Sequence, residues 1–436
     1  MKTFGAFLSA LTFLAVAIVV SAPAEEARKL KVHRKPRLET GTMGGVDNPT
    51  KDQLLKMHKS QYIFHARGGK LTRIPVKKTW LPSDPGDMSH QEIMGRLVMA
   101  DDGTVYVIGR SKVCKSTNGG RTWTSYRHDG NRGRLAGKWG AYPDHVPLFV
   151  QVLKDGTLIG VGIPHAKRGE QYWTRPAVVW TSSNGGRNWR KIARIERPTK
   201  FNGIEYEWWY ASYAMHRLPD GTLLWPVQLR NTVETAPPYT KVLVIFRSSD
   251  GGKTWQGPSP FVDWGSEGGM TRTASGKLLA TVRYQRRQLP TDPPGLLEHL
   301  GSRKTQAYKH VFLIESADEG KTWSNFRLVM SVHGQCYGFP AALPDGRVVL
   351  VHTTPYGPGP RGSRAMISHD EGKTWEDEAY YLTFSEPSGY NQSVVLKDGT
   401  ILTVASRHDF IAPWGKKTET AVAIRWKPVG RKSANR

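Results

Sequence analysis

Short apolar runs alternate with turn residues along most of this 436-residue chain. The apolar run at residues 222–227, with the sequence TLLWPV, follows an Asp-Gly pair at 220–221. Asp-Gly between two apolar runs is a strong signal for a β-hairpin, because glycine readily takes the positive φ that a tight turn requires. Such pairs recur at intervals of 53 to 70 residues, at 102–103, 155–156, 220–221, 275–276 (Ser-Gly), 345–346 and 398–399. The pattern therefore predicts six hairpins.

A second motif alternates with these hairpins. It reads Ser248-Ser-Asp-Gly-Gly-Lys-Thr-Trp255, and related octapeptides begin at Ser116, Ser182, Ser316 and Ser368. In each copy we expect the Asp or Asn to bond nearby backbone amides, a following Gly to take a positive φ, and the Trp to bury its ring below the turn. Hairpins and turns that repeat in this way are typical of small antiparallel sheets arranged around an axis. We predict an all-β fold, a six-bladed β-propeller, in a single domain.

The N-terminus has the features of an export signal. Lys2 precedes an apolar run over residues 7–20, and small residues follow at 21–24. The run is short for a membrane span, and no later stretch is long and apolar enough to cross a bilayer. We predict a signal peptide over 1–24, a polar N-terminal tail or strap over 25–84 and the propeller over 85–430, in a protein that is secreted or periplasmic.

Charge and cysteine content limit the partners. The formal net charge of +25 should attract polyanions, and the sequence leaves open whether it captures an acidic substrate or forms a solvated basic surface. We expect no nucleic-acid partner, because the charges are dispersed and no recognised motif is present. Cys114 and Cys336 fall in different blades. The sequence leaves a disulfide open after export but gives no argument for it, and we expect two buried free thiols. No cysteine cluster supports zinc, and we expect no metal, no cofactor and a monomer.

The hairpin spacing predicts which residues reach the rim around the axial mouth of the propeller. Within a blade the innermost strand leads into the Asp-Gly turn and the second strand returns. Residues about 8 to 12 before the turn and about 8 to 10 after it therefore share one rim. Among the residues that this spacing selects are His90, Glu92, Asp144, His145, Tyr210, Glu267, Tyr337 and Tyr390 before the turns, and Arg110, Arg230, Arg283 and Arg407 after them. Several arginines facing one mouth would hold an anionic sugar through paired hydrogen bonds.

The octapeptides resemble the Asp-boxes of the sialidase (neuraminidase) superfamily, and the resemblance covers about residues 89–426. It implies a six-bladed propeller in which a glutamate activates a tyrosine nucleophile and three arginines bind the substrate carboxylate. By resemblance Glu267 is the base and Tyr390 the nucleophile. Arg283 and Arg364 belong to the arginine set, with Arg361 as the alternative to Arg364. A neutral tyrosine suits an anionic substrate, because the substrate's own charge would repel a carboxylate nucleophile.

Each of these assignments has a purely structural alternative. Tyr390 could pack in an inner strand, and Glu267 and Arg283 could form an ion pair across their hairpin. Trp208 and Trp209 could stack against a sugar or pack in the core, and the sequence does not separate these two roles.

Two functional positions of the family are different in this chain. The family's first arginine lies in an Arg-Ile-Pro motif that opens the first inner strand, where this chain reads His90-Gln-Glu-Ile93. An Arg73-Ile-Pro75 exists, but it lies 29 residues before Asp102, too far for the same strand. No aspartate stands between residues 103 and 116, where the family has its general acid. A hydrolase would need another acid from the rim, and Asp144, His145 and Glu92 are the candidates.

These observations favour a secreted exo-glycosidase of the sialidase-like class that releases a terminal anionic sugar from a glycan. The sugar could be sialic acid or a related acid such as a uronic acid or a sulfated sugar. A polysaccharide lyase acting on a uronate-containing glycan is the chemical alternative. A non-catalytic glycan-binding propeller is the alternative from another class, and the two altered family positions favour it.

Overall fold

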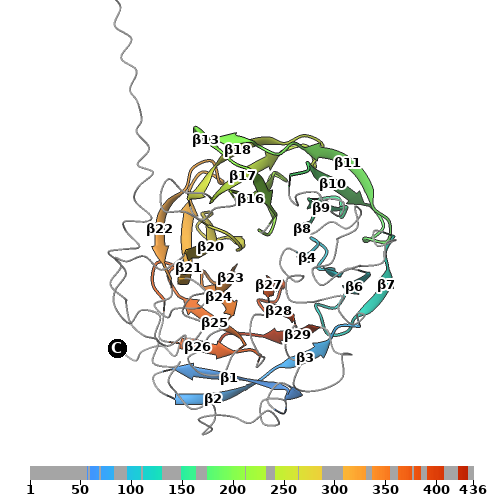
Figure 1. The fold of residues 1–436 in the computed structure, drawn as a ribbon. Helices are drawn as coiled ribbons and strands as arrows, with labels where there is room; N and C mark the ends of the chain where they lie inside the picture. Colours follow the sequence, from blue (N-terminus) through green and yellow to red (C-terminus); the bar gives the residue numbers. More distant parts are fainter. Residues whose placement is uncertain are drawn as a thin grey trace, which may run out of the picture.

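The computed structural model describes residues 56, 59–67, 70–82, 96–109, 111–129, 149–163, 174–211, 213–231, 241–263, 265–286, 308–329, 336–353, 362–375, 378–383, 390–406 and 421–430. Six antiparallel sheets stand around a central axis as the blades of a propeller (Figure 1). The predicted fold class is confirmed. No helix in the described ranges is long and apolar enough to cross a membrane.

The first three blades follow one another along the chain, each from its innermost strand outward. Blade 1 contains β4 (Leu97–Met99), β5 (Val105–Ile108), β6 (Lys112–Ser116) and β7 (Thr124–Arg127). Blade 2 contains β8 (Phe149–Val152), β9 (Leu158–Gly162), β10 (Ala177–Ser182) and β11 (Arg190–Ile195), and a two-stranded ribbon, β12 (Lys200–Phe201) and β13 (Ile204–Glu205), follows it. In blade 3, β14 (Trp208–Tyr210) and β15 (His216–Arg217) both pair with β16 (Leu223–Arg230), and β17 (Lys241–Ser248) and β18 (Gln256–Asp263) complete the sheet.

The last three blades complete the ring. Blade 4 contains β19 (Met270–Arg272), β20 (Leu278–Arg286), β21 (Tyr308–Ser316) and β22 (Ser324–Leu328). Blade 5 contains β23 (Cys336–Ala342), β24 (Val348–Thr353), β25 (Ser363–Ser368) and β26 (Glu378–Tyr381). Blade 6 contains β27 (Asn391–Val395), β28 (Ile401–Ser406) and β29 (Ala421–Trp426). Its fourth strand comes from the other end of the chain.

Residues 62–80, which the sequence analysis assigns to the strap, form three strands that pair with the last two blades. β3 (Lys77–Trp80) pairs with β29 and is the outermost strand of blade 6. β1 (Tyr62–Arg67) pairs with both β26 and β2 (Lys70–Pro75), which extends blade 5 to six strands. His65 Nε2 lies 2.8 Å from Oε1 of the buried Glu378, which fixes β1 on β26. The N-terminal segment therefore supplies edge strands to the propeller before residue 85.

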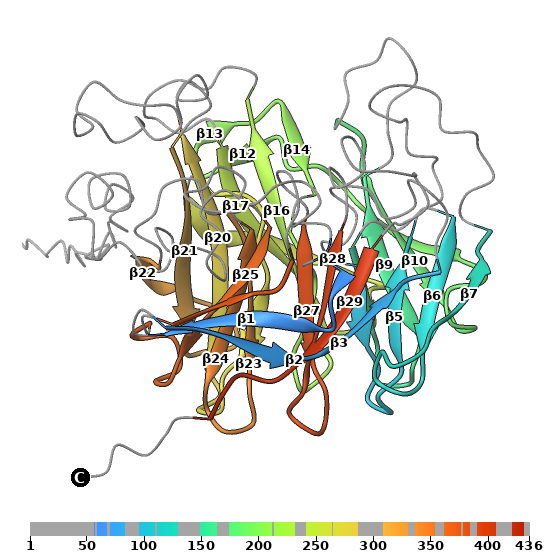
Figure 2. The same ribbon diagram turned by 90° about the horizontal axis from the view of Figure 1, so that it is seen from below.

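The six Asp-Gly or Ser-Gly pairs lie between the first and second strands of the six blades, as predicted. In blade 1 the backbone N–H of Gly103 donates to the carbonyl of Ala100 at 2.9 Å, and the N–H of Thr104 donates to Asp102 Oδ1 at 2.7 Å. The glycine has φ of 91°, a conformation that costs other residues steric strain. The turns after β23 and β27 lie on one side of the disc, and β14 lies near the other side (Figure 2).

The five octapeptides lie between the third and fourth strands of blades 1 to 5 and form the predicted turns. In the third copy the N–H of Gly252 donates to Ser248 Oγ at 2.9 Å, and the N–H of Thr254 donates to Asp250 Oδ1 at 3.0 Å. A Cβ at Gly252 would lie 2.1 Å from Cδ1 of Ile159 on β9. The turn of blade 3 thus packs directly on blade 2, and these turns join neighbouring blades as well as closing their own hairpins.

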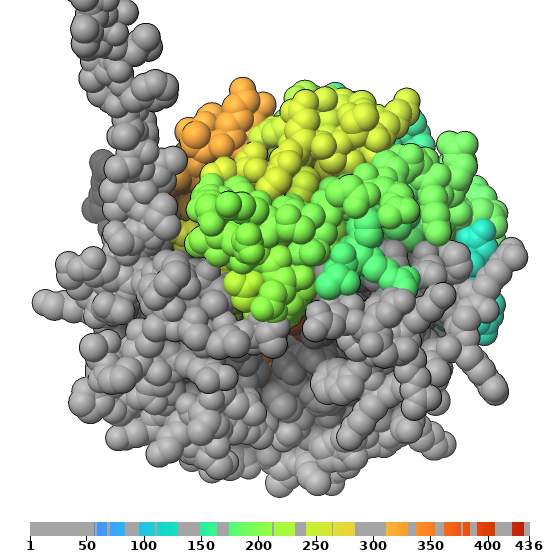
Figure 3. Space-filling view, turned by 45° about the horizontal axis from the view of Figure 1, so that its top comes forward, coloured from blue at the N-terminus to red at the C-terminus, as the bar shows by residue number. Residues whose placement is uncertain are grey.

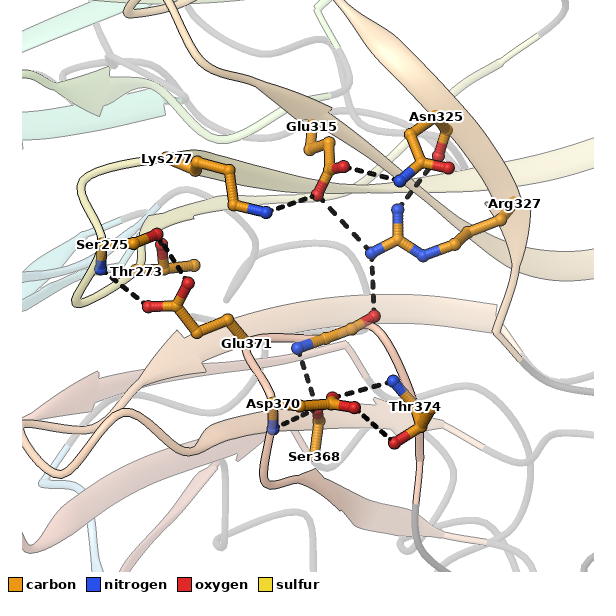
Figure 4. A network of polar contacts seen from close by, with 11 residues as sticks. Thr273, Ser275, Lys277, Glu315, Asn325, Arg327, Ser368, Asp370, Glu371 and Thr374 are labelled. Carbon is orange, nitrogen blue, oxygen red and sulfur yellow. Dashed lines mark hydrogen bonds and ion pairs between the residues drawn. The ribbon is translucent and has the colours of Figure 1, made fainter.

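Polar contacts also connect blade 4 to the turn of blade 5 at the periphery (Figure 4). Arg327 Nη2 donates to the carbonyl of Gly372 at 2.8 Å. Lys277 Nζ donates to Glu315 at 3.1 Å, and Glu371 accepts a 2.7 Å hydrogen bond from the N–H of Ser275. Arg327 and Ser275 thus attach blade 4 to the turn of blade 5, whereas the contact between Lys277 and Glu315 lies within blade 4.

Candidate active site

A buried hydrogen bond joins Tyr390 and Glu267 near the axis. The Tyr390 hydroxyl donates to Glu267 Oε1 at 2.7 Å, and the two residues are 1% and 2% exposed. Tyr390 directly precedes β27, the innermost strand of blade 6, and Glu267 lies just before β19, the innermost strand of blade 4. Because all innermost strands converge on the axis, two residues from blades 4 and 6 can meet there. The hairpin spacing predicted that both residues lie on the same rim, and the hydrogen bond between them agrees with this.

The backbone around Glu267 holds its carboxylate in place. The N–H of Ser266 donates to the carbonyl of Arg283 at 3.1 Å, and the N–H of Arg283 donates to the carbonyl of Glu267 at 2.9 Å. Two glycines follow Glu267. A Cβ at Gly268 would lie 2.1 Å from the backbone oxygen of Thr281, so a larger residue would push this segment away from β20. The Glu-Gly-Gly sequence thus allows the segment to lie flat on the second strand of the blade.

Arg283, on β20, contacts the same carboxylate. Its Nε lies 2.6 Å from Glu267 Oε2 and donates to Ser266 Oγ at 2.9 Å. Its Nη1 donates to the hydroxyl of Tyr337 at 2.9 Å. The structure therefore brings together three of the residues selected from the sequence, Glu267, Arg283 and Tyr390.

Tyr337 is the fourth member of this cluster, and sequence reasoning gave it a place on the rim but no role. Its ring centre lies 4.0 Å from that of Tyr390, and the two ring planes meet at 42°. Its φ is +59°, which is uncommon for a residue with a bulky side chain. The β23–β24 pairing shifts register between Cys336 and Phe339 at the same place. A bulge of this kind redirects a side chain, here toward the axis.

Burial raises the pKa of Tyr390 well above its ordinary value, and the negative charge of Glu267 raises it further, while Arg283 opposes the shift. The phenol is consequently neutral at physiological pH. It can become a nucleophile only if a base accepts its proton while its oxygen forms a new bond. The carboxylate at 2.7 Å is in position to do this.

Tyr210 and Arg230, also predicted on the rim, lie on blade 3. Tyr210 on β14 is close enough to Tyr390 to add a small electrostatic contribution to the raised pKa of Tyr390. Arg230 on β16 lies opposite Trp208, with its guanidinium carbon 4.4 Å from the Trp208 ring centre. The structure separates the two tryptophans: Trp209 is fully buried against Trp225, whereas Trp208 is only partly buried on the other face of β14.

Arg364 is buried on β25, two strands outward from β23. Its guanidinium carbon lies 4.7 Å from the ring centre of Tyr381 on β26, and it pairs across the sheet with His352. Burial and, to a smaller extent, the charge of Arg364 lower the pKa of His352 to about 3. The Arg364 guanidinium thus stacks on the Tyr381 ring of the neighbouring strand, and its role in substrate binding stays a prediction.

Six of the other predicted site residues lie outside the described residues: His90, Glu92, Arg110, Asp144, His145 and Arg407. Arg361, Cys336 beyond its backbone, and the predicted signal peptide also lie outside them. Arg73 of the Arg-Ile-Pro triplet stands on β2, with its guanidinium carbon 4.9 Å from the ring centre of Tyr62, far out on the blade 5 sheet. Cys114 is a buried free thiol. The described part of the chain contains no cluster of three or more metal-ligating side chains.

A cavity of about 260 Å³ lies along the axis. All six innermost strands line it, and Gln151, His216 and Gln392 are among its polar residues. Figure 3 shows the green surface of the blade 3 region beside a recess near the middle of this face. Tyr390 and Glu267 are not among its lining residues. Each lies just before an innermost strand that lines the cavity, so the pair lies near the axis, beside the cavity rather than in its wall.

Comparison with known families agrees with this architecture. The BNR repeat-like domain family matches residues 145–410, and the chain belongs to that family. Its fold is the sialidase-like propeller. No curated protein matches the chain in sequence.

Three solved structures show the same fold at low sequence identity. A Dyadobacter fermentans protein of unknown function is 18% identical, with a TM-score of 0.54 over 81% of this chain and 99% of its own. A Hadza microbial sialidase is 16% identical, with a TM-score of 0.52 over 81% of this chain and 69% of its own. An α-L-arabinanase of Penicillium chrysogenum in complex with arabinobiose is 14% identical, with a TM-score of 0.51 over 80% and 98%. At these identities the likeness concerns the fold alone.

Proposed function

We propose that this protein is an exo-acting glycoside hydrolase that releases a terminal acidic sugar from a glycan, with Tyr390 as nucleophile and Glu267 as its base. One observation carries the proposal: the buried 2.7 Å hydrogen bond from the Tyr390 hydroxyl to Glu267, in the axial region of the propeller. The sialidase and the arabinanase with the same fold act on glycans, as their names state, and support a glycosidase.

In the first step the Tyr390 oxygen attacks the anomeric carbon and Glu267 accepts the phenolic proton. The glycosidic C–O bond breaks, and an acid on the rim protonates the departing oxygen; Asp144, His145 and Glu92 are the candidates. In the second step water attacks the anomeric carbon and gives its proton to that same rim residue. The bond to Tyr390 then breaks, and Glu267 returns the proton to the phenolate oxygen. Two displacements at one carbon give net retention of configuration.

The choice of nucleophile supports an acidic sugar. A carboxylate nucleophile would approach a negatively charged substrate against repulsion, whereas the neutral Tyr390 meets none until its proton has moved. The net charge of +25 would concentrate such a substrate near the protein. Export of the chain through its N-terminal segment is part of the same proposal, because extracellular or periplasmic glycans would then be its substrates.

The test is a product assay with purified protein over residues 25–436 and its Tyr390→Phe variant. Sialylated, uronate-containing and sulfated glycans are the substrates, and mass spectrometry detects the released sugars. We expect release by the wild type and a loss on the order of 10³-fold or more in the variant. Tyr380→Phe is the matched control, because Tyr380 is also a buried tyrosine that donates to a glutamate, Glu378, but lies on the outer strand β26.

The assay also separates the alternatives. An unsaturated uronate product would identify a lyase instead of a hydrolase. Binding of a glycan without any product over long incubation would identify a binding protein, and both results would contradict the proposal.

A further inference from the structure

The guanidinium of Arg283 contacts three groups of the protein: the Glu267 carboxylate, the Ser266 hydroxyl and the Tyr337 hydroxyl. A carboxylate is gripped in paired fashion either by Nη1 and Nη2 or by Nε and Nη2. Nε already contacts Glu267 Oε2 at 2.6 Å and Ser266 Oγ at 2.9 Å, and Nη1 donates to the Tyr337 hydroxyl at 2.9 Å. The protein therefore occupies the edge that includes Nε, and Tyr337 uses one of the two N–H groups of Nη1.

Tyr337 is held in an unfavourable backbone conformation to make its contact. A φ of +59° is strained for a bulky residue, and such outliers persist where the surroundings enforce them. The register shift in β23 aims the side chain at the axis, where its hydroxyl meets Arg283 and its ring lies 4.0 Å from that of Tyr390. The guanidinium carbon of Arg283 also lies 4.9 Å from the ring centre of Tyr337. The Tyr337 side chain thus contacts both Arg283 and Tyr390, the two residues that contact the Glu267 carboxylate.

We propose that Tyr337 and Arg283 are positioning residues for the Tyr390–Glu267 pair, and that Arg283 holds the Glu267 carboxylate rather than a carboxylate of the substrate. Tyr337 fixes Arg283 through its hydroxyl and fixes the Tyr390 ring through packing. Arg283 in turn holds Oε2 of Glu267, which leaves Oε1 facing the phenol. The expected changes in kcat and KM rest on the proposed function. The inference assigns Arg283 to Glu267, whereas the family resemblance implies that Arg283 binds the substrate carboxylate.

The chemical consequence concerns the substrate. Because Arg283 is already engaged with Glu267, Ser266 and Tyr337, we expect another cation to be the main partner of an acidic group on the sugar. Loss of Arg283 should therefore impair the chemical step more than binding. A residue that only positions a base lowers kcat, whereas a residue that binds ground state and transition state equally raises KM.

The experiment compares Tyr337→Phe and Arg283→Lys with the wild type. Tyr337→Phe keeps the ring and removes the hydroxyl, and Arg283→Lys keeps a charge but cannot contact two groups from a planar fork. We expect kcat to fall roughly 10- to 100-fold in each, in line with the effect of a small displacement of a catalytic group, while KM changes less than about threefold. The acidic limb of the pH–rate profile should also move to higher pH in Arg283→Lys, because Glu267 keeps its proton more easily when its cation is displaced. Tyr380→Phe should change neither parameter.

A crystal structure of each variant supplies a readout that needs no turnover. In Tyr337→Phe we expect the Arg283 side chain to move away from Glu267. The distance between Nε and Oε2, now 2.6 Å, should become longer than a hydrogen bond. An unchanged Arg283–Glu267 contact, or a rise in KM with kcat preserved in Arg283→Lys, would overturn the inference. A wild type without any turnover would refute the proposed function but leave the structural test in force.

Discussion

The Tyr390 hydroxyl reaches Glu267 across 123 residues of sequence and from a different blade, at a distance of 2.7 Å. The contact joins the starts of the innermost strands of blades 4 and 6. Gln392, two residues after Tyr390, donates through Nε2 to the carbonyl of Leu97 in blade 1 at 2.9 Å, which joins the last innermost strand to the first. The start of β27 thus takes part both in the candidate active site and in the closure of the ring.

Closure depends on the N-terminal strands, and truncation tests this. We expect a protein that begins near residue 60 to keep the thermal stability of the longer chain, because it retains β1, β2 and β3. A protein that begins after residue 82 lacks these strands, including Trp80 against Val422. It should unfold at a markedly lower temperature and aggregate through the exposed edges of β26 and β29. Calorimetry of the two truncated proteins makes the comparison, and equal midpoints would show that blade 6 does not need its fourth strand.

The turn of blade 3 on blade 2 gives a second prediction. Gly252→Ala should lower the free energy of unfolding by about 2 to 4 kcal/mol, because φ is +87° and the added Cβ would lie 2.1 Å from Ile159. Gly156→Ala is the matched control, since its φ is +82° with nothing within 4 Å, and we expect a cost of about 1 to 2 kcal/mol. Urea denaturation measures both. Equal costs would mean that the tight packing between blades contributes nothing at this turn.

The same turns predict how stability depends on pH. At Asp250 burial would raise the pKa, but hydrogen bonds from Thr254, Ser248 and the backbone outweigh it and lower the pKa to about 2. Asp318 has the same balance of causes and a pKa of about 2. A carboxyl whose pKa is lower when folded stabilises the protein above its unfolded pKa, near 3.8, and this stabilisation is lost as pH falls toward 2.

Urea denaturation at a series of acidic pH values checks this expectation. The wild type should lose stability progressively between pH 3.8 and 2, and the double variant Asp250→Asn, Asp318→Asn should lose less over the same interval. Asparagine is a fitting replacement, because Asn118 and Asn184 occupy the equivalent positions of the first two turns. Parallel curves for the two proteins would contradict the assignment.

Much of the fold could be predicted from the sequence because its signals are local. An Asp-Gly turn or an octapeptide such as the one at Ser248 depends on neighbours in the chain, and both repeat often enough to give the number of blades. The strands at residues 62–80 carry neither signal. Their position depends on pairing with β26 and β29, which lie more than 300 residues away, so their sequence alone gave only a strap.

The site was predictable to the extent that it follows blade geometry. Glu267 and Arg283 flank one hairpin, so their proximity follows from the spacing around Ser275. The contacts of Tyr337 do not, because they depend on a positive φ and a shifted register that no residue type signals. The position of Arg364 before the fifth octapeptide could be read from the sequence. The orientation of its side chain toward Tyr381 could not, because it depends on packing between strands.

The most direct test of the account is to trap the covalent intermediate. Fluorinated glycosyl fluorides of sialic and uronic acids, which form glycosyl-enzymes that hydrolyse slowly, would be incubated with the protein, and peptide mass spectrometry would locate the adduct. The account predicts one sugar attached to the peptide that contains Tyr390, through its phenolic oxygen, and no adduct in Tyr390→Phe. An adduct on another residue, or catalytic release of a sugar by Tyr390→Phe at the wild-type rate, would contradict it.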